Sequence, residues 1–128
     1  LAGPSLAKQL NKIKLPYSVN IFTLIGAEVL VRRWDVIRGW IDTILKERER
    51  VRGALAVLQG VTVHPSEANF LLMEVSGKTP RQVFMHLAER GILIRDVSSY
   101  PMLERALRVT IGTPEENSAM LSALQEVL

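Results

Sequence analysis

The sequence contains no cysteine and only two histidines, His64 and His86, among its 128 residues. The absence of cysteine excludes a disulfide framework, a thiolate zinc site and a cysteine nucleophile. Neither histidine has a second histidine or an acid at ligand spacing, so we expect both to be ordinary surface or core residues. We therefore expect no metal centre.

Long apolar runs are also missing. The longest mostly apolar stretch, residues 21–31, includes Thr23, Gly26 and Glu28, whereas a membrane span needs about 20 apolar residues. We expect no membrane partner. The first residues show neither an initiator methionine nor a basic leader, and we interpret the sequence as a fragment or a processed piece.

The sequence has only a small excess of positive charge. The 16 Lys and Arg exceed the 13 Asp and Glu by three, and the pI is about 9.6. Basic residues between 32 and 52 invite comparison with a nucleic-acid or acidic-partner module, but acidic residues interleave with them, which favours a solvent-exposed face of ion pairs. We expect no nucleic-acid partner.

Apolar spacing predicts three helices in the first 60 residues. The first begins at Pro4 and ends before Pro16, and an extended linker follows it. The second, capped by Asn20 and running to about Arg33, is mostly apolar and is expected to be buried. The third is capped by Asp35, has apolar residues at 3.6 spacing and a charged opposite face, and stops at Gly60.

The remaining residues have a mixed pattern. Strand-like runs cover residues 61–63, 69–75, 92–96 and 106–111. Thr79 and Thr113 each precede a proline and begin a capping box for a helix. The order is β-β-α-β-β-α, so we predict an α/β (α+β-like) small domain with a small mixed or antiparallel sheet covered by helices.

Two arginines are the strongest candidates for chemistry. Arg108 lies in a period-two strand on the side opposite to Leu107 and Val109. Arg95 ends the preceding strand, and the intervening residues allow a chain reversal that brings both guanidinium groups to one pocket. Such a pair can bind a carboxylate or phosphate. The alternative is a solvated strand face, or a local pair between Arg95 and Asp96.

Three motifs in order carry a family resemblance: SEANFLL at residues 66–72, GILIRD at 91–96 and LRVTIGTPEEN at 107–117. They resemble the C-terminal part of histidinol-phosphate aminotransferases, which are fold type I enzymes using pyridoxal phosphate. The resemblance covers essentially the whole chain, residues 1–128, as a C-terminal small domain. Residues 1–60 form its helical lead-in and residues 61–128 its sheet-containing core.

The resemblance implies roles for the arginines. Arg108 matches the arginine that receives the substrate carboxylate, and Arg95 matches a second one near the phosphate or carboxylate end of the substrate. The implied substrates are histidinol phosphate and glutamate or 2-oxoglutarate, in a cytoplasmic homodimer of histidine biosynthesis. Asn69 is interpreted as a packing residue and not a catalytic one. Tyr17 is interpreted as a packing or subunit-interface residue, with an approach to the active site as the alternative.

The sequence departs from the family at the cofactor. None of the lysines has the Ser-Lys setting of the Schiff-base lysine, so we expect pyridoxal phosphate in the parent enzyme, none covalently bound to this fragment, and no activity of the fragment alone. Alternatives are a threonine-phosphate decarboxylase-like protein, another amino-acid aminotransferase, or a stand-alone small-molecule-binding regulatory domain.

Overall fold

The computed structural model describes residues 2–14 and 19–128. The chain divides into two compact units, Leu1–Arg38 and Gly39–Leu128, with the boundary inside the third helix. Within the described ranges, no helix is long and apolar enough to cross a membrane.

The first unit contains α1 (Pro4–Ile13) and α2 (Ile21–Arg32). The predicted cap of α2 is confirmed, because the Asn20 side chain accepts a hydrogen bond from the Thr23 amide at 2.9 Å. The expectation that α2 is buried is wrong: none of its residues is buried, and Phe22 is 83% exposed. An apolar composition predicts the helix but does not say which surface covers it. The predicted linker falls mostly on residues 15–18, outside the described residues.

The third helix, α3 (Trp34–Ala56), follows α2 almost without a break. Asp35 was predicted as its cap but lies in its first turn. The helix stops at Ala56, and the chain turns to reach Gly60, which has a φ of +77°. A β-carbon at Gly60 would lie 2.8 Å from Ser76 Oγ, so this turn requires glycine.

The second unit confirms the predicted order β-β-α-β-β-α. After α3 its elements are β1 (Val61–Val63), β2 (Phe70–Val75), α4 (Pro80–Glu89), β3 (Arg95–Asp96), β4 (Ala106–Thr110) and α5 (Pro114–Val127). All strand pairs are antiparallel, in the order β1-β2-β4-β3. The predicted strand over residues 92–96 is paired only at its last two residues.

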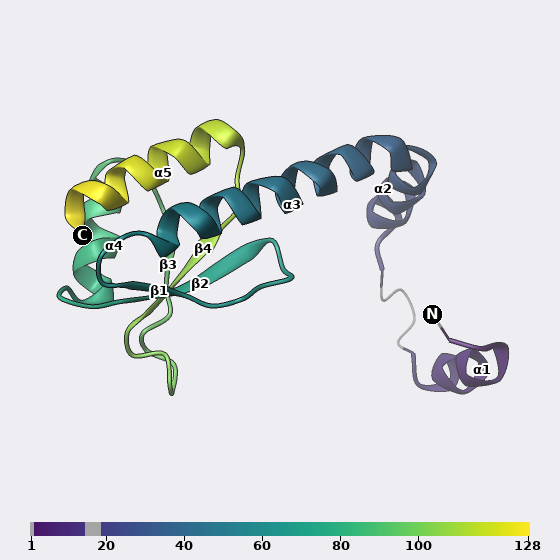
Figure 1. Ribbon diagram of the computed structural model, residues 1–128. Coiled ribbons are helices and arrows are strands. Elements are labelled where there is room, and N and C mark those ends of the chain that lie inside the picture. The colour runs from purple at the N-terminus through teal and green to yellow at the C-terminus, as the bar shows by residue number, and fades with distance from the viewer. Residues whose placement is uncertain (1, 15–18) are drawn as a thin grey trace. The chain divides into compact units, whose positions relative to one another are not determined.

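Alternation along the strands separates the two faces of the sheet. One face contributes Leu71, Met73, Val75, Leu107 and Val109 to the core, where they pack with buried residues of α3, α4 and α5. Figure 1 shows α3 and α5 crossing this face. The opposite face, which we call the open face, bears half-buried Phe70, Leu72, Glu74 and Arg108 and exposed Thr110.

The charged side of α3 differs from the prediction. Glu47 and Arg48 were expected on a solvent-exposed face, but they are only 7% and 6% exposed. Both make polar contacts with later parts of the chain, and such distant partners leave no periodic signal in the sequence.

Candidate functional site

Arg95 and Arg108 are direct partners in the antiparallel register of β3 and β4. Neighbouring strands lie about 4.8 Å apart, and directly opposed residues point to the same face. The sheet therefore brings together the two arginines that the sequence singled out. Arg108 is half-buried and Arg95 is exposed.

Both arginines line an open cavity of about 430 Å³, which we call the arginine cavity. Its lining consists of Phe84 from α4, residues 93–96, and Arg108 and Thr110 from β4. A cavity of this size accommodates a small metabolite. Its polar groups include two guanidinium groups, which bind carboxylate or phosphate through paired N–H donors.

Neither arginine is neutralised by a carboxylate within residues 2–14 and 19–128, since neither forms an ion pair there. Asp96 instead accepts hydrogen bonds from the backbone N–H of Ser98 at 2.9 Å and its hydroxyl at 2.6 Å. The alternative local pair between Arg95 and Asp96 is thus not formed.

The guanidinium of Arg108 is also incompletely satisfied. Its Nε is buried and has no hydrogen-bond partner in the part of the chain that the structure describes. Its Cζ lies 5.1 Å from the centre of the Phe70 ring. Like charges directly opposed on neighbouring strands are destabilising. A bound anion would offset the repulsion between the two arginines, so the arrangement favours binding of an anionic ligand.

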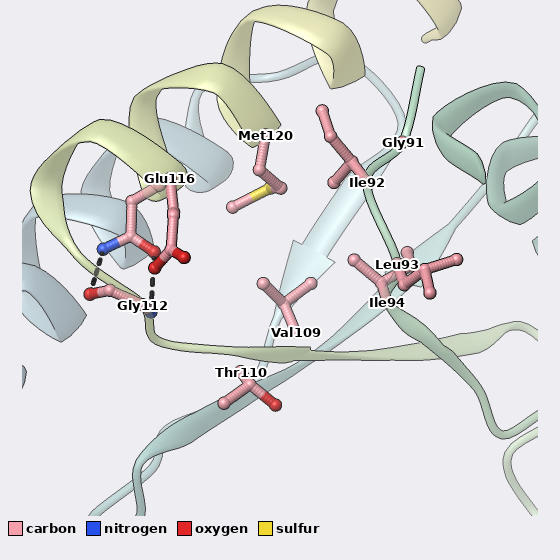
Figure 2. Close-up of a pocket in the computed structure, with 10 residues that line it drawn as sticks. Gly91, Ile92, Leu93, Ile94, Val109, Thr110, Gly112, Glu116 and Met120 are labelled. Atoms are coloured by element: carbon pink, nitrogen blue, oxygen red, sulfur yellow. Dashed lines mark hydrogen bonds between the residues drawn. The ribbon is translucent and has the colours of Figure 1, made fainter. Parts of the chain in front are cut away.

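A second cavity, of about 310 Å³, adjoins the arginine cavity and shares Leu93, Ile94 and Thr110 with it. Figure 2 shows the apolar side chains of Ile92, Ile94, Val109 and Met120 around it, near the start of α5. Its one carboxylate, Glu116, accepts the Thr113 backbone N–H at 2.8 Å. The arginine cavity is therefore the better site for an anion.

A buried polar network fixes the loop after β4. Asn117, 2% exposed, donates through Nδ2 to Glu47 Oε2 at 2.8 Å and to the Gly112 carbonyl at 3.0 Å. Its Oδ1 accepts the Gly112 N–H at 2.9 Å; the bonds to Gly112 are the dashed lines in Figure 2. Arg50 donates two hydrogen bonds to Glu47. The hydrogen bonds from Arg50, followed by that from Asn117, lower the pKa of Glu47.

The other singled-out residues lie elsewhere. His64 Nε2 is 2.8 Å from Glu74 Oε1 on the open face, and His86 is on α4. No group of three potential metal ligands occurs within the described ranges. Asn69 is exposed, and its carbonyl accepts the Ile111 N–H at 2.9 Å. Tyr17 lies outside the described residues.

The lysines do not fit a covalent site for pyridoxal phosphate. The chain has five, namely Lys8, Lys12, Lys14, Lys46 and Lys78. All are exposed, and none lines either cavity described above. A Schiff-base lysine needs a pocket that desolvates it and orients the cofactor. Two arginines of this chain line the arginine cavity, and no lysine does.

Sequence comparisons match nearly the whole chain to the aminotransferase family that the three sequence motifs resemble. The family model "Aminotransferase class I and II" matches residues 5–124. A histidinol-phosphate aminotransferase from Thermoanaerobacter sp. is 40% identical over 128 residues, covering 100% of this chain. The chain spans 35% and 36% of the length of the first curated relatives it matches.

Solved structures of related enzymes have the same fold as this chain. L-threonine-O-3-phosphate decarboxylase from Porphyromonas gingivalis superposes on 99% of this chain and 40% of its own, with a TM-score of 0.76 and 27% identity. A histidinol-phosphate aminotransferase from Clostridium acetobutylicum gives a TM-score of 0.84 over 96% of this chain and 38% of its own, at 23% identity. With the family match over most of its residues, the chain belongs to the class I and II aminotransferases.

Proposed function

We propose that this chain supplies the substrate-anion site of a pyridoxal-phosphate-dependent aminotransferase that transfers an amino group between glutamate and histidinol phosphate in histidine biosynthesis. The observation that carries the proposal is the directly opposed pair Arg95 and Arg108, which lines one cavity without a carboxylate partner in the described chain. The family match supports pyridoxal phosphate as the cofactor of the complete protein, and the names of the relatives support the substrate.

Arg108 receives the carboxylate of glutamate in this proposal. Its guanidinium presents parallel N–H donors to both carboxylate oxygens, an arrangement that a lysine ammonium does not reproduce. Arg95, more exposed and on the edge strand, faces the phosphate or carboxylate at the far end of the substrate.

The complete protein acts as a cytoplasmic homodimer in this proposal, and the chain by itself is inactive. The arginines bind and orient the substrate, while the amino-group chemistry belongs to the cofactor and to the lysine that holds it. No lysine of this chain lines the arginine cavity.

Steady-state kinetics of the complete protein that carries this chain test the proposal. Arg108→Lys is expected to lower kcat/KM for glutamate by about 10- to 100-fold, because a charge-assisted hydrogen bond contributes about 1.5–3 kcal/mol. Arg95→Lys is expected to affect histidinol phosphate more than glutamate. Values within about twofold of wild type for both variants and both substrates would sink the proposal.

The likeness to L-threonine-O-3-phosphate decarboxylase favours a second candidate, a decarboxylase of phosphorylated amino acids. Its substrate also carries a carboxylate and a phosphate, so the same two arginines suit it. Product analysis separates the candidates: carbon dioxide release from threonine phosphate without amino transfer to 2-oxoglutarate would favour the decarboxylase.

A further inference from the structure

The open face of the sheet places an aromatic ring beside Arg108. In the register of β2 and β4, Leu72 opposes Arg108 and Phe70 opposes Thr110. Phe70 is therefore the diagonal neighbour of Arg108 on the same face. The 5.1 Å between Arg108 Cζ and the ring centre lies within the range of a cation–π contact.

Phe70 and Arg95 flank Arg108 from opposite sides, because β4 lies between β2 and β3. The positive charge of Arg95 repels the Arg108 guanidinium, whereas the face of the Phe70 ring attracts it. A carboxylate in the place of the ring would occupy the N–H donors and cancel the charge. An aromatic ring holds the cation and leaves its charge and donors for a ligand.

The backbone around Phe70 is itself fixed. The Ser66 hydroxyl donates to the Phe70 carbonyl at 2.6 Å and accepts the Ala68 N–H at 3.1 Å. Arg48, buried on α3, donates to the Ala68 carbonyl at 3.3 Å and to Glu67 Oε2 at 3.1 Å. These contacts involve Ser66, Glu67, Ala68 and Phe70 of the motif at residues 66–72, and they fix the backbone that leads into β2.

We propose that Phe70 is a positioning residue for Arg108: its ring holds the guanidinium beside the arginine cavity, oriented for a carboxylate, without neutralising it. This inference rests on the proposed function, in which Arg108 binds the substrate carboxylate. It assigns Phe70 to specificity for carboxylate substrates and not to the amino-transfer chemistry.

The test uses the complete protein, with glutamate as substrate and glutarate, which has no amino group, as an equilibrium probe. Phe70→Leu removes the ring and Phe70→Tyr retains it. Leu72→Val is the matched control, because it trims an apolar side chain directly opposite Arg108 without touching the ring. The measurements are KM and kcat for glutamate and the Kd of glutarate by calorimetry.

Phe70→Leu is expected to raise KM for glutamate and Kd for glutarate by about 3- to 30-fold, the range of a cation–π contact, with kcat within about twofold. Phe70→Tyr and Leu72→Val are expected to stay within about twofold of wild type in all three values. In an Arg108→Gln background, Phe70→Leu is expected to add less than about twofold, since the ring then has no cation to hold.

Three results would overturn the inference: unchanged KM and Kd in Phe70→Leu, an equal loss in Leu72→Val, or a full additional loss in the Arg108→Gln background. Failure of the underlying function is distinguishable, because Arg108→Lys would then leave glutamate kinetics unchanged. A strong effect of Arg108→Lys together with a silent Phe70→Leu would contradict only the role of Phe70.

Discussion

Arg108 combines a half-buried position with a charge that no carboxylate pairs with among the described residues. Its nearest partner across β3 is another arginine, and its stabilising contact is with the Phe70 ring. An acidic residue in the place of Arg95 would pair with Arg108 and neutralise its charge. The arrangement makes the free chain less stable and a bound anion more favourable, which is the expected signature of a binding residue.

A second residue-scale feature is Glu47, which titrates unlike a free carboxylate. Its folded-state pKa lies below the ordinary value of 4.5 because Arg50 and Asn117 donate hydrogen bonds to it. The unfolded state therefore binds more protons as pH falls, and the contribution of Glu47 to stability, fully present above about pH 4.5, is lost as pH drops through the folded-state pKa. Glu47→Gln is expected to flatten this part of the pH profile.

Urea unfolding midpoints between about pH 6 and pH 3 measure the effect. Glu89→Gln is the control, because that exposed carboxylate forms no ion pair within the described part of α4 or its surroundings. If Glu47→Gln and wild type lose stability in parallel over this range, the network around Glu47 does not contribute as described.

Some of the site could be predicted residue by residue and some could not. The alternation around Arg108 placed it opposite the apolar side of its strand, and the structure agrees. The sequence places Phe70 in the motif at residues 66–72 but does not indicate its contact with Arg108, because that contact depends on the register of β2 and β4. The alternation of side chains along a strand places Phe70 on the same face as Leu72, but it does not say which residue of the neighbouring strand lies beside it.

At the scale of elements, the two capping boxes were predicted from four-residue patterns and are both present. Thr113 accepts the Glu116 N–H, and the Glu116 side chain accepts the Thr113 N–H. Thr79 and Gln82 form the equivalent box on α4. Caps depend on neighbours in sequence, so local patterns are enough to find them.

Thr113→Ala tests the cap of α5 directly. The change removes the side-chain acceptor of the Glu116 N–H and is expected to lower the free energy of unfolding by about 1 kcal/mol. Denaturant midpoints give the measurement, and Ser122→Ala, exposed further along the same helix, is the control. An unchanged midpoint in Thr113→Ala would mean that α5 is not anchored by this box.

Contacts between residues that are far apart in the chain could not be predicted from the sequence. Periodicity identified α2 and α3 as helices. However, α2 has no buried residue, and two charged residues of α3, Glu47 and Arg48, are buried. Glu47 meets Asn117, and Arg48 meets Ala68 and Glu67, across long separations in the chain. Helical spacing predicts faces of a helix and not the elements that cover them.

At the scale of the whole molecule, the second unit contains the arginine cavity, while the first unit contains α2, whose apolar side chains are exposed. The chain matches about a third of the length of its curated relatives. In the proposed function, substrate anions bind to this chain and the cofactor is held covalently by another segment of the complete protein.

This separation predicts that the chain by itself forms no specific covalent adduct with pyridoxal phosphate. Borohydride reduction followed by peptide mapping is expected to show only low, scattered labelling of the five exposed lysines, since none of them lines either cavity described above. Stoichiometric labelling of a single lysine would contradict this account of where the cofactor is held.

In the proposed function Arg108 binds the substrate carboxylate, and the Kd of glutarate for the complete protein measures that contact without a catalytic step. Arg90→Lys is the matched control, because Arg90 forms its own exposed pair with Glu126 at 2.6 Å and lines neither cavity described above. We expect Arg108→Lys to weaken glutarate binding by about 10- to 100-fold and Arg90→Lys to change it by less than about twofold. A Kd for Arg108→Lys that matches wild type and the control would contradict this expectation.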